Sequence, residues 1–229
     1  MVYLFRLVTT PNTSSSQPTN ELGQSEKEEL ELCYEENRKL AQIWRRPDKS
    51  SIWFVAIDLN TYDINEQIIT DIGIASWCLD KKSKTKSYYW CIDHPQHFED
   101  NNTLNKGEPF AYGKTQLIDE CNIGPSLSEK FNNTTSRHET VCLVGHDIDN
   151  KIKSLKPYWE APSGFLILDT QKIWKAQHRN ITDAHLEQCL LSIPTLRHQN
   201  VLTNSGNRAQ AVIQLLRTQG PISVSSKAT

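Results

Sequence analysis

The sequence predicts an α/β domain with a mixed sheet, preceded by a helical extension. Three apolar runs, 52–59, 68–78 and 87–92, follow one another closely, which is typical of an antiparallel meander. After them, strand-like and helical segments alternate, which favours parallel strands separated by helices. The chain has 229 residues, enough for one such domain of about 170–180 residues and an N-terminal extension.

The N-terminal part is expected to comprise a disordered segment, residues 1–24, and a helix within residues 25–48. The first segment is mostly polar, and its few apolar side chains cannot offset the entropy of ordering. Ser25 and Glu28 fit a capping box at the start of the helix. Apolar side chains then recur at helical spacing, namely Leu30, Cys33, Leu40, Ile43 and Trp44. We expect this stripe to pack on the following domain; the alternative is a solvent-exposed helix with one apolar side.

The main domain is assigned to residues 49–220 and a flexible tail to 221–229. Asp63 and Asn65 are expected in a turn after the first strand, and a long polar insert covers roughly 93–113. Two further strands are predicted at 140–145 and 164–168, which gives a sheet of five strands, three antiparallel and then two parallel. Helices are predicted at 114–121, 125–134, 149–155, 169–177, 183–192 and 207–218.

Composition excludes several classes of protein. The net charge is −2, so the whole chain has no basic excess for a phosphate backbone, although a local basic face remains open. None of the six cysteines forms a C-x-x-C pair, which argues against zinc and favours reduced thiols inside the cell, in cytoplasm or nucleus. The apolar start, MVYLFRLV, is too short for a secretion signal, and no apolar run reaches the roughly 20 residues that span a bilayer.

Asp58 is the first candidate for chemistry. It closes the apolar strand FVAIDLN and is followed two residues later by Asn60. A period of two places both side chains on one face of a strand. A carboxylate at the end of a buried strand is costly unless it is paired or binds a ligand, and two-metal nucleases hold Mg²⁺ with carboxylates in such positions. Taken alone, an Asp that closes a strand is more often a turn or cap residue.

Further motifs follow FVAIDLN in order along the chain, namely IITDIGIASWCLD, LVGHDIDNKIKSL, LILDTQKIW and LTNSGNRAQAVIQLL. Together these segments resemble motifs of the DEDD (DnaQ-like) 3′–5′ exonuclease superfamily, which has a ribonuclease H-like fold. The resemblance covers residues 52–218, and its segment PFAYGKTQLI (109–118) is similar to the fungal Gfd-type exonuclease-like domain. It implies hydrolysis of a phosphodiester from a 3′ end with Mg²⁺ or Mn²⁺.

The family's acidic positions are mostly replaced in this chain. Asp58 matches the first of them, while Asn60 stands where the family has Glu. Lys151 stands at the Asp of the second motif, Thr203 at the general-base His, and Arg208 at the last metal-binding Asp. Two cations in place of two anions reverse the electric field of the site. We therefore expect no metal unless Asp58 retains one, and expect Lys151 and Arg208 to pair with Asp58.

Other residues near these motifs are less suited to rescue catalysis. Asp147 and Asp149 lie close to Lys151 in sequence, but a shift of two residues rotates a side chain by about 200° around a helix. His198 lies ten residues before Arg208 rather than five. His146 is read as a structural histidine at a strand end or as a contact to nucleic acid. Asp169 is expected to cap the helix that follows it.

The predicted function is that of a catalytically degenerate exonuclease-like domain, a pseudoenzyme rather than an enzyme. Its ligand would be single-stranded nucleic acid, held by His146, Lys151 and Arg208 in place of metal ions. A second hypothesis is a scaffold that binds a protein partner through the N-terminal helix. A third is an active 3′–5′ exonuclease with atypical ligands that include Asp147 and Asp149. No membrane partner is expected.

Overall fold

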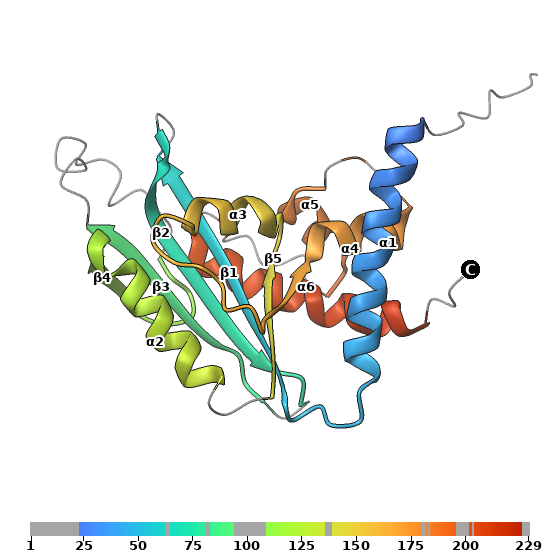
Figure 1. The fold of residues 1–229 in the computed structure, drawn as a ribbon, viewed down its shortest axis with the longest axis horizontal. Coiled ribbons are helices and arrows are strands. Elements are labelled where there is room, and N and C mark those ends of the chain that lie inside the picture. The colour runs from blue at the N-terminus through green and yellow to red at the C-terminus, as the bar shows by residue number, and fades with distance from the viewer. Residues whose placement is uncertain are drawn as a thin grey trace, which may run out of the picture.

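Six strands form one mixed sheet in the order β4-β3-β2-β1-β5-β6 (Figure 1). The structure is a computed structural model that describes residues 23–62, 65–80, 83–93, 109–135, 139–179, 182, 184–195, 202 and 204–225. The strands are β1 (Ile52–Tyr62), β2 (Asn65–Cys78), β3 (Lys86–Asp93), β4 (Thr115–Asp119), β5 (Thr140–Gly145) and β6 (Leu166–Asp169). The helices are α1 (Gln24–Arg45), α2 (Ile123–Thr135), α3 (Ile148–Leu155), α4 (Thr170–His178), α5 (Leu186–Ser192) and α6 (Ser205–Ser225).

The strand pairing confirms the predicted ribonuclease H-like arrangement of three antiparallel and two parallel strands. β1 and β3 run antiparallel to β2, and β5 and β6 continue the sheet in parallel with β1. The prediction of five strands and of a helix at 114–121 was wrong. This segment forms β4, parallel to β3, and a short 3₁₀ turn, Glu120–Asn122. β4 is an edge strand whose Leu117 is 63% exposed, so it lacks the apolar alternation by which strands are recognised.

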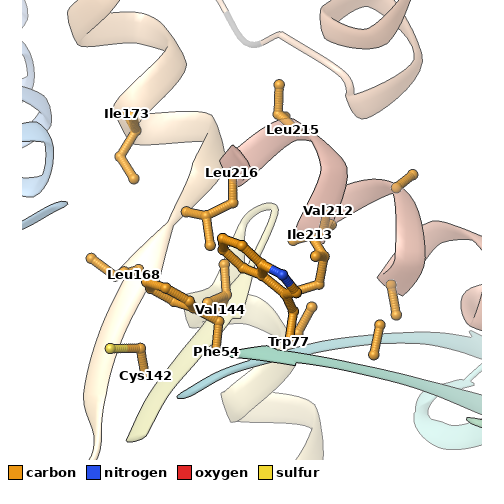
Figure 2. Close-up of a cluster of buried hydrophobic side chains, with 14 of the residues drawn as sticks. Phe54, Trp77, Cys142, Val144, Leu168, Ile173, Val212, Ile213, Leu215 and Leu216 are labelled. Carbon is orange, nitrogen blue, oxygen red and sulfur yellow. The ribbon is translucent and has the colours of Figure 1, made fainter. Parts of the chain in front are cut away.

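Helices cover both faces of the sheet, and each face has its own apolar core. Along β1, Phe54 and Ala56 belong to one core, while Val55 and Ile57 belong to the other, as a period of two requires. α1, α4, α5 and α6 pack on the first face, and α2 and α3 pack on the second (Figure 1). In the first core, Phe54 stacks on Trp77 with ring centroids 5.7 Å apart, beneath side chains of α6 (Figure 2).

α1 is part of this first core, so the alternative of a solvent-exposed helix was wrong. Leu40 and Ile43 are buried, and Trp44 lies 6.0 Å from Trp77 between ring centroids. The cap differs from the prediction, because Glu26 rather than Glu28 reaches back, accepting a hydrogen bond from the Gly23 backbone N–H at 2.8 Å. The segment 1–22 lies outside the described residues.

α6 extends to Ser225 and therefore contradicts a flexible tail that starts at residue 221. Its last turns pack on α1, and a Cβ added at Gly220 would meet the Trp44 ring at 2.4 Å. Only a glycine fits this contact between the two helices. Residues 226–229, and Asp63 of the predicted turn, lie outside the described residues; Asn65 begins β2 instead. None of the helices in the described part of the chain combines the length and apolar character needed to cross a membrane.

Candidate functional site

Asp58 lies near the C-terminal end of β1, on the face that α6 covers. Asp58 is only 4% exposed. One carboxylate oxygen, Oδ1, lies 3.3 Å from Lys151 Nζ, and the other, Oδ2, accepts a hydrogen bond from Arg208 Nε at 2.5 Å. The two cations thus pair with Asp58, as their positions in the motifs led us to expect.

Arg208 extends from the first turn of α6 and joins three groups of β1. Besides Asp58, its Nη2 donates to Asn60 Oδ1 at 2.6 Å and to the Leu59 carbonyl at 3.1 Å. Burial on its own lowers the pKa of Arg208, but the charge and hydrogen bond of Asp58, helped by Asp71, outweigh it and raise the pKa above its ordinary value. The guanidinium is therefore a permanent positive charge fixed at the end of β1.

Asp71 is a member of the site that the motif analysis did not single out. It lies on β2 opposite Asn60 and is 8% exposed. Its two oxygens accept hydrogen bonds from Asn60 Nδ2 at 3.2 and 3.0 Å, and Oδ1 accepts another from the Ser205 backbone N–H at 3.1 Å. A carboxylate within a mostly apolar strand, as in IITDIGI, is the signal that marks it.

The close approach of α6 to the sheet fixes Arg208 over Asp58. Gly73 pairs with Asp58 across the β1–β2 ladder. A Cβ at Gly73 would lie 2.0 Å from the Ser205 carbonyl oxygen, so the start of α6 rests directly on the backbone of β2. A glycine is needed here because backbone approaches backbone.

Asp169 positions Lys151 by capping two helices at once. Its Oδ1 accepts from the backbone N–H groups of Gln171 at 2.8 Å and Lys172 at 3.4 Å, so the predicted cap of α4 is confirmed. Oδ2 also accepts from the Ile148 N–H at 3.2 Å, at the start of α3. Burial raises the pKa of Asp169, although its backbone hydrogen bonds oppose this. The carboxylate thus anchors the helix that carries Lys151.

Both ring nitrogens of His146 contact other groups of the protein. Its Nδ1 lies 3.0 Å from Thr170 Oγ1, and its Nε2 lies 2.6 Å from the Ala184 carbonyl oxygen. Burial lowers the pKa of His146, which favours the neutral ring, with Nε2–H donating to the Ala184 carbonyl oxygen, while the Thr170 hydroxyl beside Nδ1 donates to the Gly145 carbonyl oxygen at 3.0 Å. With both nitrogens engaged and the residue 8% exposed, this geometry fits the structural reading of His146.

The carboxylates of Asp147 and Asp149, considered as replacement ligands, are each engaged by another side chain. The carboxylate of Asp149 binds Lys172 Nζ at 2.5 Å, outside the site. The carboxylate of Asp147 accepts from Asn150 Nδ2 at 2.7 Å. Thr203 and His198 lie outside the described residues.

A hollow of about 640 Å³ opens beside this cluster. Side chains of β1, α3, α5 and α6 meet around it, and sequence reasoning had not identified the contribution of α5. Its lining consists of Asp58, Leu59, Asn60, Thr61, His146, Asp147, Asn150, Lys151, Gln171, His185, Leu186, Glu187 and Arg208.

The residues present do not fit the divalent ions that the family uses. Mg²⁺ requires several oxygens that are free to converge on one point. Both Asp58 oxygens face cations, and the Asn60 oxygen accepts from Arg208. In the part of the chain that the structure describes, no group of three or more His, Cys, Asp and Glu side chains could hold a metal ion.

Comparison with known proteins agrees with this fold. Residues 53–218 match the family described as DNA polymerase III subunit epsilon-like, C-terminal domain. A protein of the yeast Schizosaccharomyces pombe, named only as an uncharacterized nucleolar protein, is 24% identical over 171 residues, which cover 72% of this chain and 67% of the relative. The family match includes Asp58, Asn60, Asp71, Lys151 and Arg208, which we call the Asp58 cluster. It leaves out α1 and the last turns of α6.

Proposed function

Because the chain belongs to the family of DNA polymerase III subunit epsilon-like domains, we propose that it is an exonuclease-like domain that binds single-stranded nucleic acid without metal and without cleaving it. The observation that carries this proposal is the pairing of both Asp58 oxygens with cations.

The physical reason for binding without cleavage is that the side-chain cations of Lys151 and Arg208 replace the positive charge of the metal ions. In the family, metal ions bring positive charge to the phosphate and also activate water. An ammonium and a guanidinium can keep the first role, because both form charge-assisted hydrogen bonds with phosphate oxygens. They cannot keep the second, because neither lowers the pKa of a bound water as a metal does. Binding would thus survive while hydrolysis is lost.

Lys151 is the better candidate for the phosphate contact. Its side chain is 22% exposed, it lines the hollow, and it lies at 3.3 Å from Asp58, a longer contact than that of Arg208. Arg208 already donates to three groups of β1, so its main role would be to fix the positions of Asp58, Asn60 and the Leu59 carbonyl.

Binding in the presence of EDTA tests the first half of the proposal. Fluorescence anisotropy with labelled single-stranded RNA and DNA should show the same affinity with EDTA as with Mg²⁺, and weaker affinity for the Lys151→Gln variant. The matched control is Lys130→Gln, a change on α2 away from the hollow. Binding that requires Mg²⁺, or no binding by the wild type, would contradict the proposal.

Cleavage is tested separately with an oligonucleotide labelled at its 5′ end and incubated with Mg²⁺ or Mn²⁺. We expect no shortening from the 3′ end. Shortening by the wild type that disappears in Asp58→Asn would establish an active exonuclease and refute the loss of catalysis.

The scaffold hypothesis receives less support from the structure. Leu40, Ile43 and Trp44 of α1 pack in the first core, so only the outward side of this helix is left for a protein partner. The yeast relative bears the word nucleolar in its name, and we propose a nuclear location for this chain on that basis. A fluorescent fusion excluded from the nucleus would argue against it.

A further inference from the structure

A second hollow, of about 560 Å³, lies beside the first along α3. The two share Leu59, Thr61, Asn150 and Lys151 in their linings. Lys151 therefore lines both of them, and we call the two adjoining hollows together the groove. The residues found only in the second hollow are Lys153, Ser154 and Pro157.

One face of α3 forms the wall of this second hollow. Asn150, Lys153, Ser154 and Pro157 are spaced by three, four and seven residues, which places them on one side of a helix and its continuation. The other wall is the end of β1, with Leu59 and Thr61. The two walls of the second hollow, α3 and the end of β1, are thus joined by the ion pair between Lys151 and Asp58.

The two hollows differ in charge. Three carboxylates, Asp58, Asp147 and Glu187, line the first hollow against two cations. The second is lined by Lys151 and Lys153, and no described residue with a carboxylate lines it. Since Lys151 is paired with Asp58, Lys153 is the cation of the second hollow that no described carboxylate of its lining offsets, and it attracts an anionic group there.

We propose that the second hollow is a subsite for a backbone phosphate of a single-stranded nucleic acid, held by Lys153, while Lys151 stays paired with Asp58 at the boundary with the first hollow. This inference rests on the proposed function. It adds the direction of the bound nucleic-acid strand, which would run from the Asp58 cluster along α3. No Phe, Tyr or Trp is among the described residues that line either hollow. Among the described residues, the contact offered by this hollow is therefore with phosphate and not with a base.

The test uses labelled oligothymidylates that grow by one nucleotide at a time, measured by anisotropy in EDTA over a range of salt concentrations. For the wild type, affinity should rise in a step when the chain becomes long enough to reach the second hollow. In Lys153→Gln the step should vanish, and the slope of log affinity against log salt should become shallower by about 0.7, the value for one phosphate contact on a single strand.

The matched control is Lys156→Gln, the same change of charge at an exposed position just after α3 that lines neither hollow. It should keep both the step and the salt slope. If Lys153→Gln and Lys156→Gln lower affinity equally, the effect is one of general charge and the subsite is refuted.

The outcomes also separate this inference from the proposed function. If the wild type binds no oligonucleotide of any length, the proposed function fails and the subsite fails with it. If the wild type binds but Lys153→Gln leaves the length dependence and salt slope unchanged, the subsite alone is refuted. Polyglutamate of matched charge should compete weakly; equal competition would assign the groove to acidic peptides and overturn the nucleic-acid assignment.

Discussion

Among single residues, Asp58 is the one on which the site depends most. Its replacement by Asn keeps the shape but leaves Lys151 and Arg208 without their shared anion in a buried place. Removing one partner of a buried ion pair is strongly destabilising, so we expect Asp58→Asn to lower the free energy of unfolding by about 3 kcal/mol. Chemical denaturation measures this.

Asp149→Asn provides the control for that measurement. It also breaks a carboxylate–lysine pair, but Asp149 is 66% exposed, and exposed pairs contribute only about 0–1 kcal/mol. Equal losses for the two variants would mean that the ion pairs of Asp58 are no more important than a surface contact.

His146 makes stability depend on pH. Burial lowers its pKa below the ordinary 6.5, so as pH falls through 6.5 the unfolded chain takes up a proton that the folded chain resists, and stability falls. Asp169, whose pKa burial raises above 3.8, acts in the opposite sense in its own, more acidic window. We expect the loss below pH 6.5 to be smaller in His146→Gln than in the wild type, as measured by denaturation at a series of pH values. An equal loss in both proteins would assign the effect to other groups.

The positions of Lys151 and Arg208 could be predicted from the sequence because motif order and spacing place them on known elements. Asp71 was missed because its role depends on Asn60 and Ser205, which are far from it in sequence. The dual cap made by Asp169 was predicted only in part, since its bond to the start of α3 depends on the parallel pairing of β5 and β6.

Among the elements, α6 owes its position to Gly73. Replacing Gly73 by Ala would put a Cβ 2.0 Å from the Ser205 carbonyl oxygen, so α6 would have to move off the sheet and carry Arg208 away from Asp58. We expect a loss of about 3 kcal/mol in the free energy of unfolding, at the upper end for overpacking. Gly164→Ala is the control, because no atom lies within 4 Å of the added carbon. If Gly73→Ala had the same free energy of unfolding as the wild type, α6 would not lie this close to the backbone of β2.

α1 is tied to the site through one buried carboxylate. Glu36 accepts a hydrogen bond from the Asp169 N–H at 3.0 Å and is 7% exposed. Glu36→Ala leaves that buried N–H without its acceptor, and we expect it to cost about 2 kcal/mol, measured by chemical denaturation. Glu35→Ala, on the exposed side of the same helix, should be close to neutral. A loss no larger for Glu36→Ala than for Glu35→Ala would contradict this link.

Most elements could be predicted from apolar periodicity, and the two errors have physical causes. β4 is short, polar and exposed, so TQLID carries no strand signal, and only pairing with β3 makes it a strand. The last turns of α6 include Gly220 and Pro221, which normally end a helix. Packing against Trp44 overrides that local preference.

For the whole molecule, the folded unit is larger than the region that the family match covers. Residues 53–218 leave out α1 and the end of α6, yet Gln177 on α4 donates to Asn37 of α1 at 3.1 Å and to the Gln219 carbonyl at 2.9 Å. We expect a 53–218 fragment to keep secondary structure but to bind the dye ANS and lose near-UV circular dichroism, as partly folded states do. A fragment with native near-UV signals would place the boundary of the folded unit at residue 53.

The packing of the partly buried Trp44 against Phe54 and Trp77 has a consequence for the search for protein partners. Deleting residues 1–48 would expose these rings, so a partner lost on deletion could reflect misfolding as easily as a missing contact. The outward side of α1 offers a cleaner probe in Leu32, which is 59% exposed. Leu32→Glu changes what another protein would meet there and leaves the interior untouched, so any partner it displaces was bound to that side of the helix.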